Sequence, residues 1–312
     1  MWIYFLIVIS AIILLFVIPH FIVSYLLFRR YFARRSDEEI KNYFFNSSYY
    51  DSVRGTMLES LNRLNELDCR VLEITSFYNI SIRGYYYPNN SKKTIILAHG
   101  HHADPRCIFA YTAERFYKEG FNVLIIAQRA HSISGGKYSS LGLFESKDIL
   151  SWVEYVNKEL GCKDIFVYGM SMGGTSLAIA SSKLDKNIVK GIVLDCPYPS
   201  LNKLINQLGT SLHVPQFLFI KTLEMYVKAY IKIRFKDVDS KESLANNNIP
   251  TLFIGGKNDN ISIESFIQEM YNTCACNKEI YIVDNAPHAI DLILGGNAAF
   301  DKLLAFVNEQ ET

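Results

Sequence analysis

The sequence has no excess of either charge and no repeated or low-complexity tract. Its 312 residues include 32 lysines and arginines and 31 aspartates and glutamates, which gives a formal net charge of +1. Proteins that bind nucleic acids usually carry a strongly basic face, so this balance speaks against a nucleic acid as partner. The lack of repeats favours one globular domain with an appendage, and the length is sufficient to bury a sizeable core.

Cysteine is scarce as well, and it is scattered. Only two of the six cysteines, Cys274 and Cys276, lie close together. One intervening residue is too short for the C-x-x-C pair that commonly binds zinc. We therefore expect free thiols in a reducing compartment, and a chain that needs no metal or other cofactor.

Ionisable side chains are missing from residues 2–28, with the exception of His20. This apolar run is longer than the roughly 20 residues that cross a bilayer. It lacks the basic start, the short apolar core and the small-residue cleavage site of a signal peptide, so we expect a single permanent transmembrane helix. Arginines follow it at once, and the positive-inside rule places them and the domain after them on the cytoplasmic face. These are Arg29, Arg30, Arg34 and Arg35.

The chain divides into three predicted parts. Residues 1–35 form the membrane anchor and its basic flank. Residues 36–69 are polar and rich in tyrosine, and Ser36 followed by three acidic residues predicts that a helix begins there. We interpret residues 36–69 as a helical lead-in and residues 70–312 as the globular domain.

From residue 70 onward, short apolar runs alternate with segments of helical length. Eight such runs predict an α/β fold with a mostly parallel eight-stranded sheet, whose first two strands are joined by a short turn. Ligands bind sheets of this kind at the carboxyl ends of the strands. The predicted strands are residues 70–74, 80–87, 94–98, 122–126, 165–168, 191–194, 251–254 and 279–283.

A serine between two glycines follows the fifth predicted strand. Residues 169–173 read Gly-Met-Ser-Met-Gly, and small residues open the predicted helix behind them. This pattern between a buried strand and a helix is typical of a nucleophile elbow, a strained turn that exposes a serine hydroxyl. The glycines are needed because the turn brings strand and helix backbones close together. Ser171 is therefore the candidate nucleophile, and an ordinary glycine-rich turn is the alternative.

The loop after the third predicted strand contains three histidines, His99, His101 and His102. Acyl transfer needs two N–H donors for the oxyanion, and one of them normally comes from this loop. We assign this role to the backbone N–H of His101, together with that of Met172. A metal site is the alternative, but adjacent histidines in an extended loop point in different directions, and no histidine and carboxylate pair at i, i+4 spacing accompanies them.

A general base for Ser171 must come from the seven histidines of the chain. His288 lies in the loop directly after the last predicted strand, where its ring can reach the carboxyl edge of the sheet. The remaining histidines lie in the apolar N-terminal run, after the third strand, or, like His131 and His213, before the later strands. His288 is therefore the predicted base.

The acid that orients this histidine should follow the seventh strand. Asp259 lies there, which gives the chain order Ser, Asp, His. Asp195, after the sixth strand, and Asp284, close to the histidine in sequence, are its rivals.

Together these residues resemble the α/β-hydrolase superfamily over roughly residues 70–310. Residues 128–138 read Gln-Arg-Ala-His-Ser-Ile-Ser-Gly-Gly-Lys-Tyr, which is similar to the D-Q-R-A-H-G-x-S-x-G-K-Y block of membrane-anchored bacterial hydrolases related to prolyl-oligopeptidase-like serine peptidases. The chain departs from that block at Ala127 and Ser132. Neither departure touches the predicted triad, so they bear on subfamily and loop conformation.

The resemblance implies a helical cap above the site, formed by an insertion at about residues 198–248. Its apolar content favours a hydrophobic acyl pocket, although the same side chains could simply pack the cap on the core. We expect a membrane-anchored serine hydrolase that acts on a small-molecule or lipid-like ester or thioester. A peptidase, an acyltransferase and a non-catalytic binding protein are the alternatives.

Overall fold

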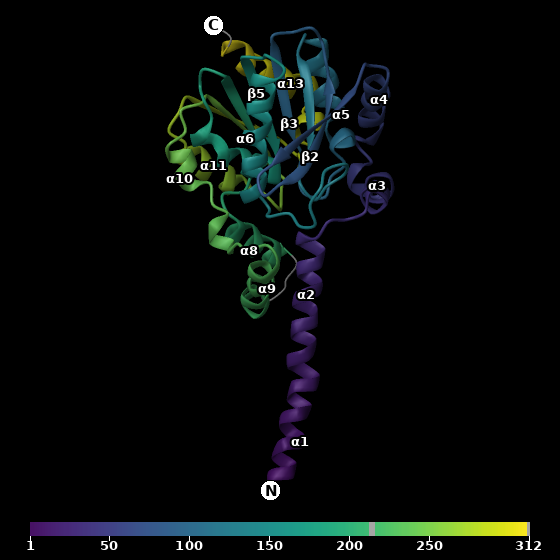
Figure 1. Ribbon diagram of the computed structural model, residues 1–312, viewed down its shortest axis with the longest axis vertical. Coiled ribbons are helices and arrows are strands. Elements are labelled where there is room, and N and C mark those ends of the chain that lie inside the picture. The colour runs from purple at the N-terminus through teal and green to yellow at the C-terminus, as the bar shows by residue number, and fades with distance from the viewer. Residues whose placement is uncertain (212–215, 311–312) are drawn as a thin grey trace.

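The computed structural model describes residues 1–211 and 216–310. An eight-stranded sheet runs through the domain with helices on both faces, and one long helix leads away from it (Figure 1). His213 and its neighbours within the predicted cap lie outside the described residues. The boundaries placed at residues 35 and 69 stay predictions.

The sheet confirms the predicted fold class, because all eight predicted runs are strands. The order is β1-β2-β4-β3-β5-β6-β7-β8. β2 pairs antiparallel with both β1 and β4, and all other neighbours are parallel. The strands are β1 (Arg70–Ser76), β2 (Ile80–Tyr87), β3 (Lys93–Ala98), β4 (Asn122–Ala127), β5 (Asp164–Met170), β6 (Val189–Asp195), β7 (Thr251–Gly256) and β8 (Lys278–Val283).

Helices cover both faces of the sheet and form the cap and the N-terminal segment. They are α1 (Trp2–Ile12), α2 (Ile18–Phe32), α3 (Asp37–Asn46), α4 (Arg54–Asn65), α5 (Pro105–Lys118), α6 (Leu143–Lys158), α7 (Met172–Ala180), α8 (Leu201–Ser211), α9 (Gln216–Tyr230), α10 (Lys241–Ala245), α11 (Glu264–Thr273), α12 (Asp291–Leu294) and α13 (Gly296–Glu309). A π-helical turn, Ile13–Val17, joins α1 to α2.

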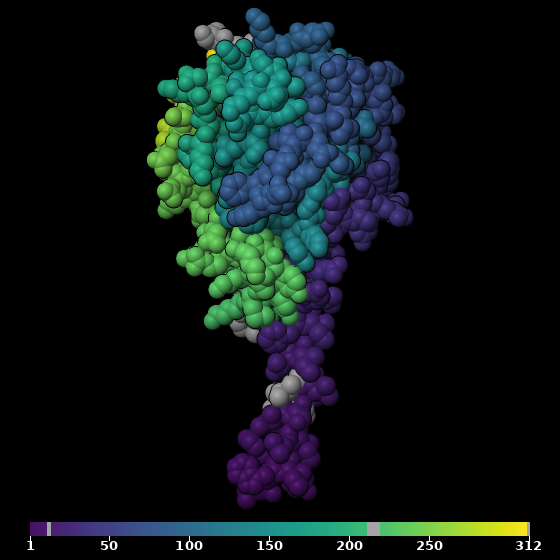
Figure 2. Space-filling view, in the orientation of Figure 1, coloured from purple at the N-terminus to yellow at the C-terminus, as the bar shows by residue number. Residues whose placement is uncertain are grey.

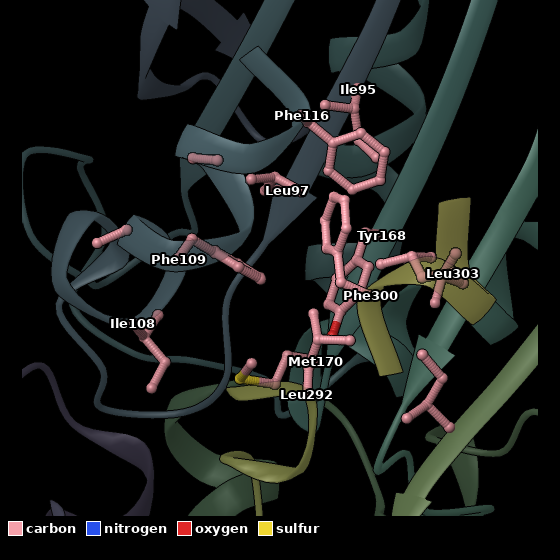
Figure 3. Close-up of a cluster of buried hydrophobic side chains, with 14 of the residues drawn as sticks. Ile95, Leu97, Ile108, Phe109, Phe116, Tyr168, Met170, Leu292, Phe300 and Leu303 are labelled. Atoms are coloured by element: carbon pink, nitrogen blue, oxygen red, sulfur yellow. The ribbon is translucent and has the colours of Figure 1, made fainter. Parts of the chain in front are cut away.

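Alternate residues of the central strands enter two separate cores. Ile95 and Leu97 of β3 pack under α4, α5 and α13, whereas Ile96 and Ala98 of the same strand pack under α6, α7 and α11. This alternation follows from the period of two along a strand. Figure 3 shows the first core, where the rings of α5 and α13 meet those of the sheet. The parallel strands β3 to β7 are buried along almost their whole length and are mostly apolar, whereas the edge strand β8 is half-buried.

The N-terminal segment is one helix from Trp2 to Phe32, long and apolar enough to cross a membrane by its length and composition. It projects away from the domain, and only its last turns contact the rest of the protein (Figures 1 and 2). The cap helices α8 and α9 lie between β6 and β7 in sequence and pack beside α2.

Ser36 caps the N-terminus of α3, because its hydroxyl accepts a hydrogen bond from the Glu39 N–H. Its position before three acidic residues predicts this cap.

Candidate active site

A strained turn carries Ser171 between β5 and α7. Ser171 has a φ of +53°, in the left-handed region that a side chain rarely adopts. A Cβ atom on Gly173 would collide with the carbonyl oxygen of Ala98, and one on Gly169 with the backbone of Gly173. The glycines are therefore required by close backbone approach. The hydroxyl lies at the N-terminus of α7, where unpaired N–H groups favour negative charge.

Three predicted site residues are joined by hydrogen bonds at the carboxyl edge of the sheet. The Ser171 Oγ lies 2.8 Å from Nε2 of His288, and Nδ1 of the same ring lies 2.6 Å from Oδ2 of Asp259. The other carboxylate oxygen of Asp259 accepts the backbone N–H groups of Ile261 and Ser262, both at 2.8 Å. These bonds hold the carboxylate so that it fixes the ring and its tautomer, with the proton on Nδ1 and a free lone pair towards serine.

The two rival acids have other partners. Oδ2 of Asp195 accepts the hydroxyl of Tyr168 in the protein interior. Burial and the nearby charge of Asp291 raise the pKa of the Asp195 carboxyl well above its usual range. Asp284 is exposed and pairs with Lys257 at 3.4 Å. Of the three carboxylates, Asp259 is the one that bonds to His288.

The loop after β3 lies against the nucleophile. A Cβ atom on Gly100 would come within 3.3 Å of the Ser171 Cβ, so the loop backbone passes directly beside the serine. His101 and Gly100 both line the cavity above Ser171, and Met172 is the first residue of α7. The oxyanion role of the His101 and Met172 N–H groups stays a prediction.

The histidines around this loop form a packed cluster. Nitrogen atoms of His101, His102 and His131 lie within 4.8 Å of one another, close enough to share a metal ion. However, Nε2 of His131 accepts the backbone N–H of His102 at 3.0 Å, and its Nδ1 lies 2.8 Å from the carbonyl oxygen of Arg129. Burial lowers the pKa of the His131 ring. A neutral His131 with both nitrogens engaged is a structural support of the loop in this arrangement.

Residues 128–138, the block that resembles other hydrolases, contact the loop after β3. The backbone N–H of Gln128 donates to Nε2 of His99 at 3.0 Å. Arg129 forms a salt bridge with Asp148 at 2.6 Å, and both side chains are almost fully buried. Removing one partner of such a buried ion pair strongly destabilises the fold, because the other charge is left buried and unpaired. The block therefore contacts the loop after β3 through the bond between Gln128 and His99.

Sequence reasoning missed a set of supports from the N-terminal region. The Arg34 guanidinium donates to the carbonyl oxygens of Ser132 and Ser134, and the His102 ring lies 3.2 Å from the carbonyl oxygen of Ala33. The hydroxyl of Tyr49 donates to the carbonyl oxygen of His288. These contacts join residues that are far apart in the chain, so no local sequence pattern predicts them. The tyrosine-rich composition of the lead-in was the one available signal.

An apolar cavity of about 370 Å³ leads to the serine and the histidine. Its volume lies in the range of small-molecule sites. Much of the wall comes from α2, α8 and α9, so the predicted cap does border a hydrophobic pocket, and Tyr43, Tyr49 and Tyr50 also line it. Representative wall residues are Leu27 and Tyr31 of α2, Leu204 and Leu208 of α8, and Ile220 and Leu223 of α9.

The family model described as serine aminopeptidase, S33, matches residues 89–247, just over half of the chain. The chain belongs to this family. It is thus an α/β hydrolase, as the sequence resemblance indicated, while the link to prolyl-oligopeptidase-like peptidases stays a prediction.

Individual relatives agree with the family. YqkD of Bacillus subtilis, itself uncharacterised, is 26% identical over 220 residues, which cover 70% of this chain and 72% of YqkD. The structure of the Pyrococcus furiosus esterase Pf2001 matches with a TM-score of 0.65 at 24% identity, covering 80% of this chain and 94% of that one. An α/β hydrolase of Vibrio vulnificus matches with a TM-score of 0.61 at 17% identity, covering 84% and 92%. These likenesses show a hydrolase fold shared with esterases.

Proposed function

We propose that the protein is a membrane-anchored serine hydrolase that cleaves a carboxylic ester or thioester through an acyl-enzyme on Ser171. One observation carries the proposal: the continuous hydrogen-bonded chain from the Ser171 hydroxyl through His288 to Asp259. A serine, a histidine and a buried carboxylate in this order are the parts of an activated nucleophile.

The geometry supports a two-step reaction. Oγ of Ser171 attacks the carbonyl carbon while its proton passes to Nε2 of His288, and the carbonyl oxygen becomes an oxyanion facing the N–H groups of His101 and Met172. The intermediate collapses, and the leaving alcohol or thiol takes the proton from the histidine. Water then attacks the acyl-enzyme with the same histidine as base, which releases the acid and restores the serine. Asp259 stabilises the imidazolium in both steps.

Membrane attachment is the second part of the proposal. Of the predicted segment 2–28, the residues up to about Phe21 would span the bilayer, supported by the exposed apolar side chains of Trp2–Ile9 and Leu14–Ile18. The end of the segment, such as Phe28, is buried against the cap. The arginines that follow it favour the cytoplasmic face for the catalytic domain. We therefore propose that the protein interacts with the bilayer and with a small-molecule or lipid-like acyl substrate.

A peptidase is the second candidate, because the family description names a serine aminopeptidase. An aminopeptidase must bind a cationic α-amino group, and a buried cation needs a carboxylate or several acceptors. Among the described residues that line the cavity there is no aspartate or glutamate. This lining favours an uncharged acyl group and therefore an ester or thioester.

Labelling with a fluorophosphonate tests the nucleophile directly. The wild-type protein should become labelled, and Ser171→Ala should not. Ser151→Ala, on α6 and bonded to the Lys147 carbonyl, is the matched control and should label like wild type. Folded wild-type protein that resists the probe would contradict the proposal. Parallel assays with p-nitrophenyl acetate and leucine p-nitroanilide separate the esterase from the aminopeptidase.

A further inference from the structure

The cavity above Ser171 is closed on one side by the N-terminal helix itself. Leu27, Tyr31 and Phe32 of α2 line it, while Ser171 and His288 lie in the same lining. A helix that served only as a tether would have no reason to border the catalytic serine. The last turns of the apolar helix are therefore part of the binding site.

The two faces of α2 differ sharply at this level. Leu26 is 58% exposed, whereas its neighbour Leu27 faces the cavity. Tyr31 follows Leu27 by one helical turn and so lies on the same face. Phe28 is fully buried against the cap, with its ring centroid 5.1 Å from that of Tyr230 on α9. The cap and the helix thus pack tightly against each other beside the cavity.

Contacts between α2 and α9 also fix where the cavity lies relative to a bilayer. A hydrocarbon core takes about 20 helical residues at about 1.5 Å each, which from Trp2 reaches as far as Phe21. At that level His20 Nε2 lies 2.7 Å from the Thr222 hydroxyl, and the Tyr226 hydroxyl donates to the carbonyl oxygen of Phe21 at 3.2 Å. On that spacing the cap would meet the helix at the membrane surface. Figure 2 shows the cap packed beside the helix.

The cavity begins a short distance beyond that level. Leu27 follows Phe21 by about 9 Å along the helix axis. Opposite it lie Leu208, Ile220 and Leu223 of the cap. No lysine, arginine, aspartate or glutamate occurs among the described lining residues. The described lining between the membrane surface and Ser171 is thus mostly apolar, with tyrosine hydroxyls and histidine rings as its polar side-chain groups beside Ser171 itself.

We propose that α2 and the cap together form an acyl-chain site, and that the substrate is a long-chain acyl ester or thioester drawn from the bilayer. The chain lies between Leu27 and Tyr31 on one side and Ile220 on the other, with its carbonyl carbon at Ser171 Oγ. The polar part of the substrate leaves as the alcohol or thiol. This inference rests on the proposed hydrolase activity and adds its substrate class and route of entry.

Two adjacent leucines provide the first test, in full-length protein held in phosphatidylcholine nanodiscs. Leu27→Trp fills the cavity, whereas Leu26→Trp places the same ring on the exposed face. Each methylene moved from water into an apolar site favours binding about fourfold. Displacing two of them should lower the ratio of kcat/KM for p-nitrophenyl dodecanoate to that for the acetate about fifteenfold in Leu27→Trp. Leu26→Trp should keep the wild-type ratio.

A second variant guards against misfolding. Ile220→Trp enters the same space from α9 and should lower the ratio in the same direction. Fluorophosphonate labelling of each variant shows that its serine is intact. If both cavity variants label normally and keep the wild-type ratio, the acyl-chain site is refuted.

Vesicles test the route of entry. Protein in phosphatidylcholine vesicles should hydrolyse p-nitrophenyl hexadecanoate placed in the same vesicles at least about tenfold faster than the ester in separate vesicles, because lateral diffusion replaces transfer through water. Equal rates would overturn entry from the bilayer. These outcomes differ from failure of the hydrolase proposal, in which wild type neither labels nor cleaves the acetate.

Discussion

The two ends of the long N-terminal helix have the same kinds of side chain and opposite surroundings. Leu6 and Phe16 of the outer end are 60% and 69% exposed, whereas Phe28 and Phe32 of the inner end are 0% and 1% exposed. Hydropathy alone treats these residues alike. What separates them is contact with the cap, some two hundred residues later in the chain. One apolar run thus contains both a proposed membrane span and a wall of the catalytic domain.

The largest expected effect is a loss of kcat when His288 at the sheet edge is replaced, compared with a replacement in the N-terminal helix. His288→Ala should lower kcat for ester hydrolysis at least about a thousandfold, because it removes the base that activates Ser171. The matched control is His20→Ala, which removes a histidine from the helix and its bond to Thr222. We expect the control to change kcat less than about threefold. Similar losses from both variants would mean that the helix takes part in the chemistry.

Two phenylalanines of the same helix test the comparison by stability. Phe28→Ala should lower the free energy of unfolding of the domain by about 3–5 kcal/mol, the usual cost of emptying a buried aromatic site. Phe16→Ala should leave it unchanged, since that ring touches no core cluster and is exposed. Chemical denaturation in detergent, followed by intrinsic fluorescence, measures both. Equal effects would show that the inner end is not part of the domain core.

Acid stability probes the junction between the N-terminal helix and the loop after β3, where the His102 ring lies 3.2 Å from the carbonyl oxygen of Ala33. Burial lowers the pKa of the His102 ring to about 3, against about 6.5 in an unfolded chain. The unfolded state therefore takes up the proton first, so stability is full above about pH 6.5 and falls as the pH drops towards about 3. The loss is at most about 1.4 kcal/mol per pH unit.

His102→Gln should make this acid slope shallower between about pH 6.5 and pH 4. Urea midpoints at several pH values measure it. The slope should not vanish, because burial also lowers the pKa of His99 to about 3. An unchanged slope would mean that His102 is solvated in the folded protein.

The smallest effect concerns the lead-in. Tyr49→Phe removes the hydroxyl that donates to the carbonyl oxygen of His288. A hydrogen bond of this kind contributes about 1 kcal/mol, so kcat should fall up to about fivefold with little change in KM. Tyr117→Phe removes a hydroxyl bonded to the carbonyl oxygen of Pro88 instead and should have no effect. A fall in both variants would point to general destabilisation.

The parts of this molecule that sequence predicts are those with local causes. Strands were predictable because residues buried on both faces form apolar runs, as in β3 and β4. The elbow around Ser171 was predictable because close backbone approach demands glycine at fixed positions. Asp259 and His288 followed from their places after β7 and β8, since parallel strands bring their carboxyl ends to one edge.

The supports of the site could not be predicted in the same way. Arg34 donates two hydrogen bonds and Tyr49 donates one, all to backbone carbonyl oxygens, and a backbone acceptor has no sequence signature. The inner face of α2 was hidden for another reason: an apolar residue satisfies a bilayer and a protein core equally well. Only the packing of α9 on α2 distinguishes Leu27 from Leu26.

The measurement that tests the central claim most directly is detection of the acyl-enzyme. Protein mixed with p-nitrophenyl butyrate should be quenched within its first turnovers, digested and examined by mass spectrometry. The account predicts a butyryl group on the peptide that contains Ser171, and its accumulation in any variant with slowed deacylation. Steady ester hydrolysis with the butyryl group on another residue, or with turnover undiminished in Ser171→Ala, would contradict it.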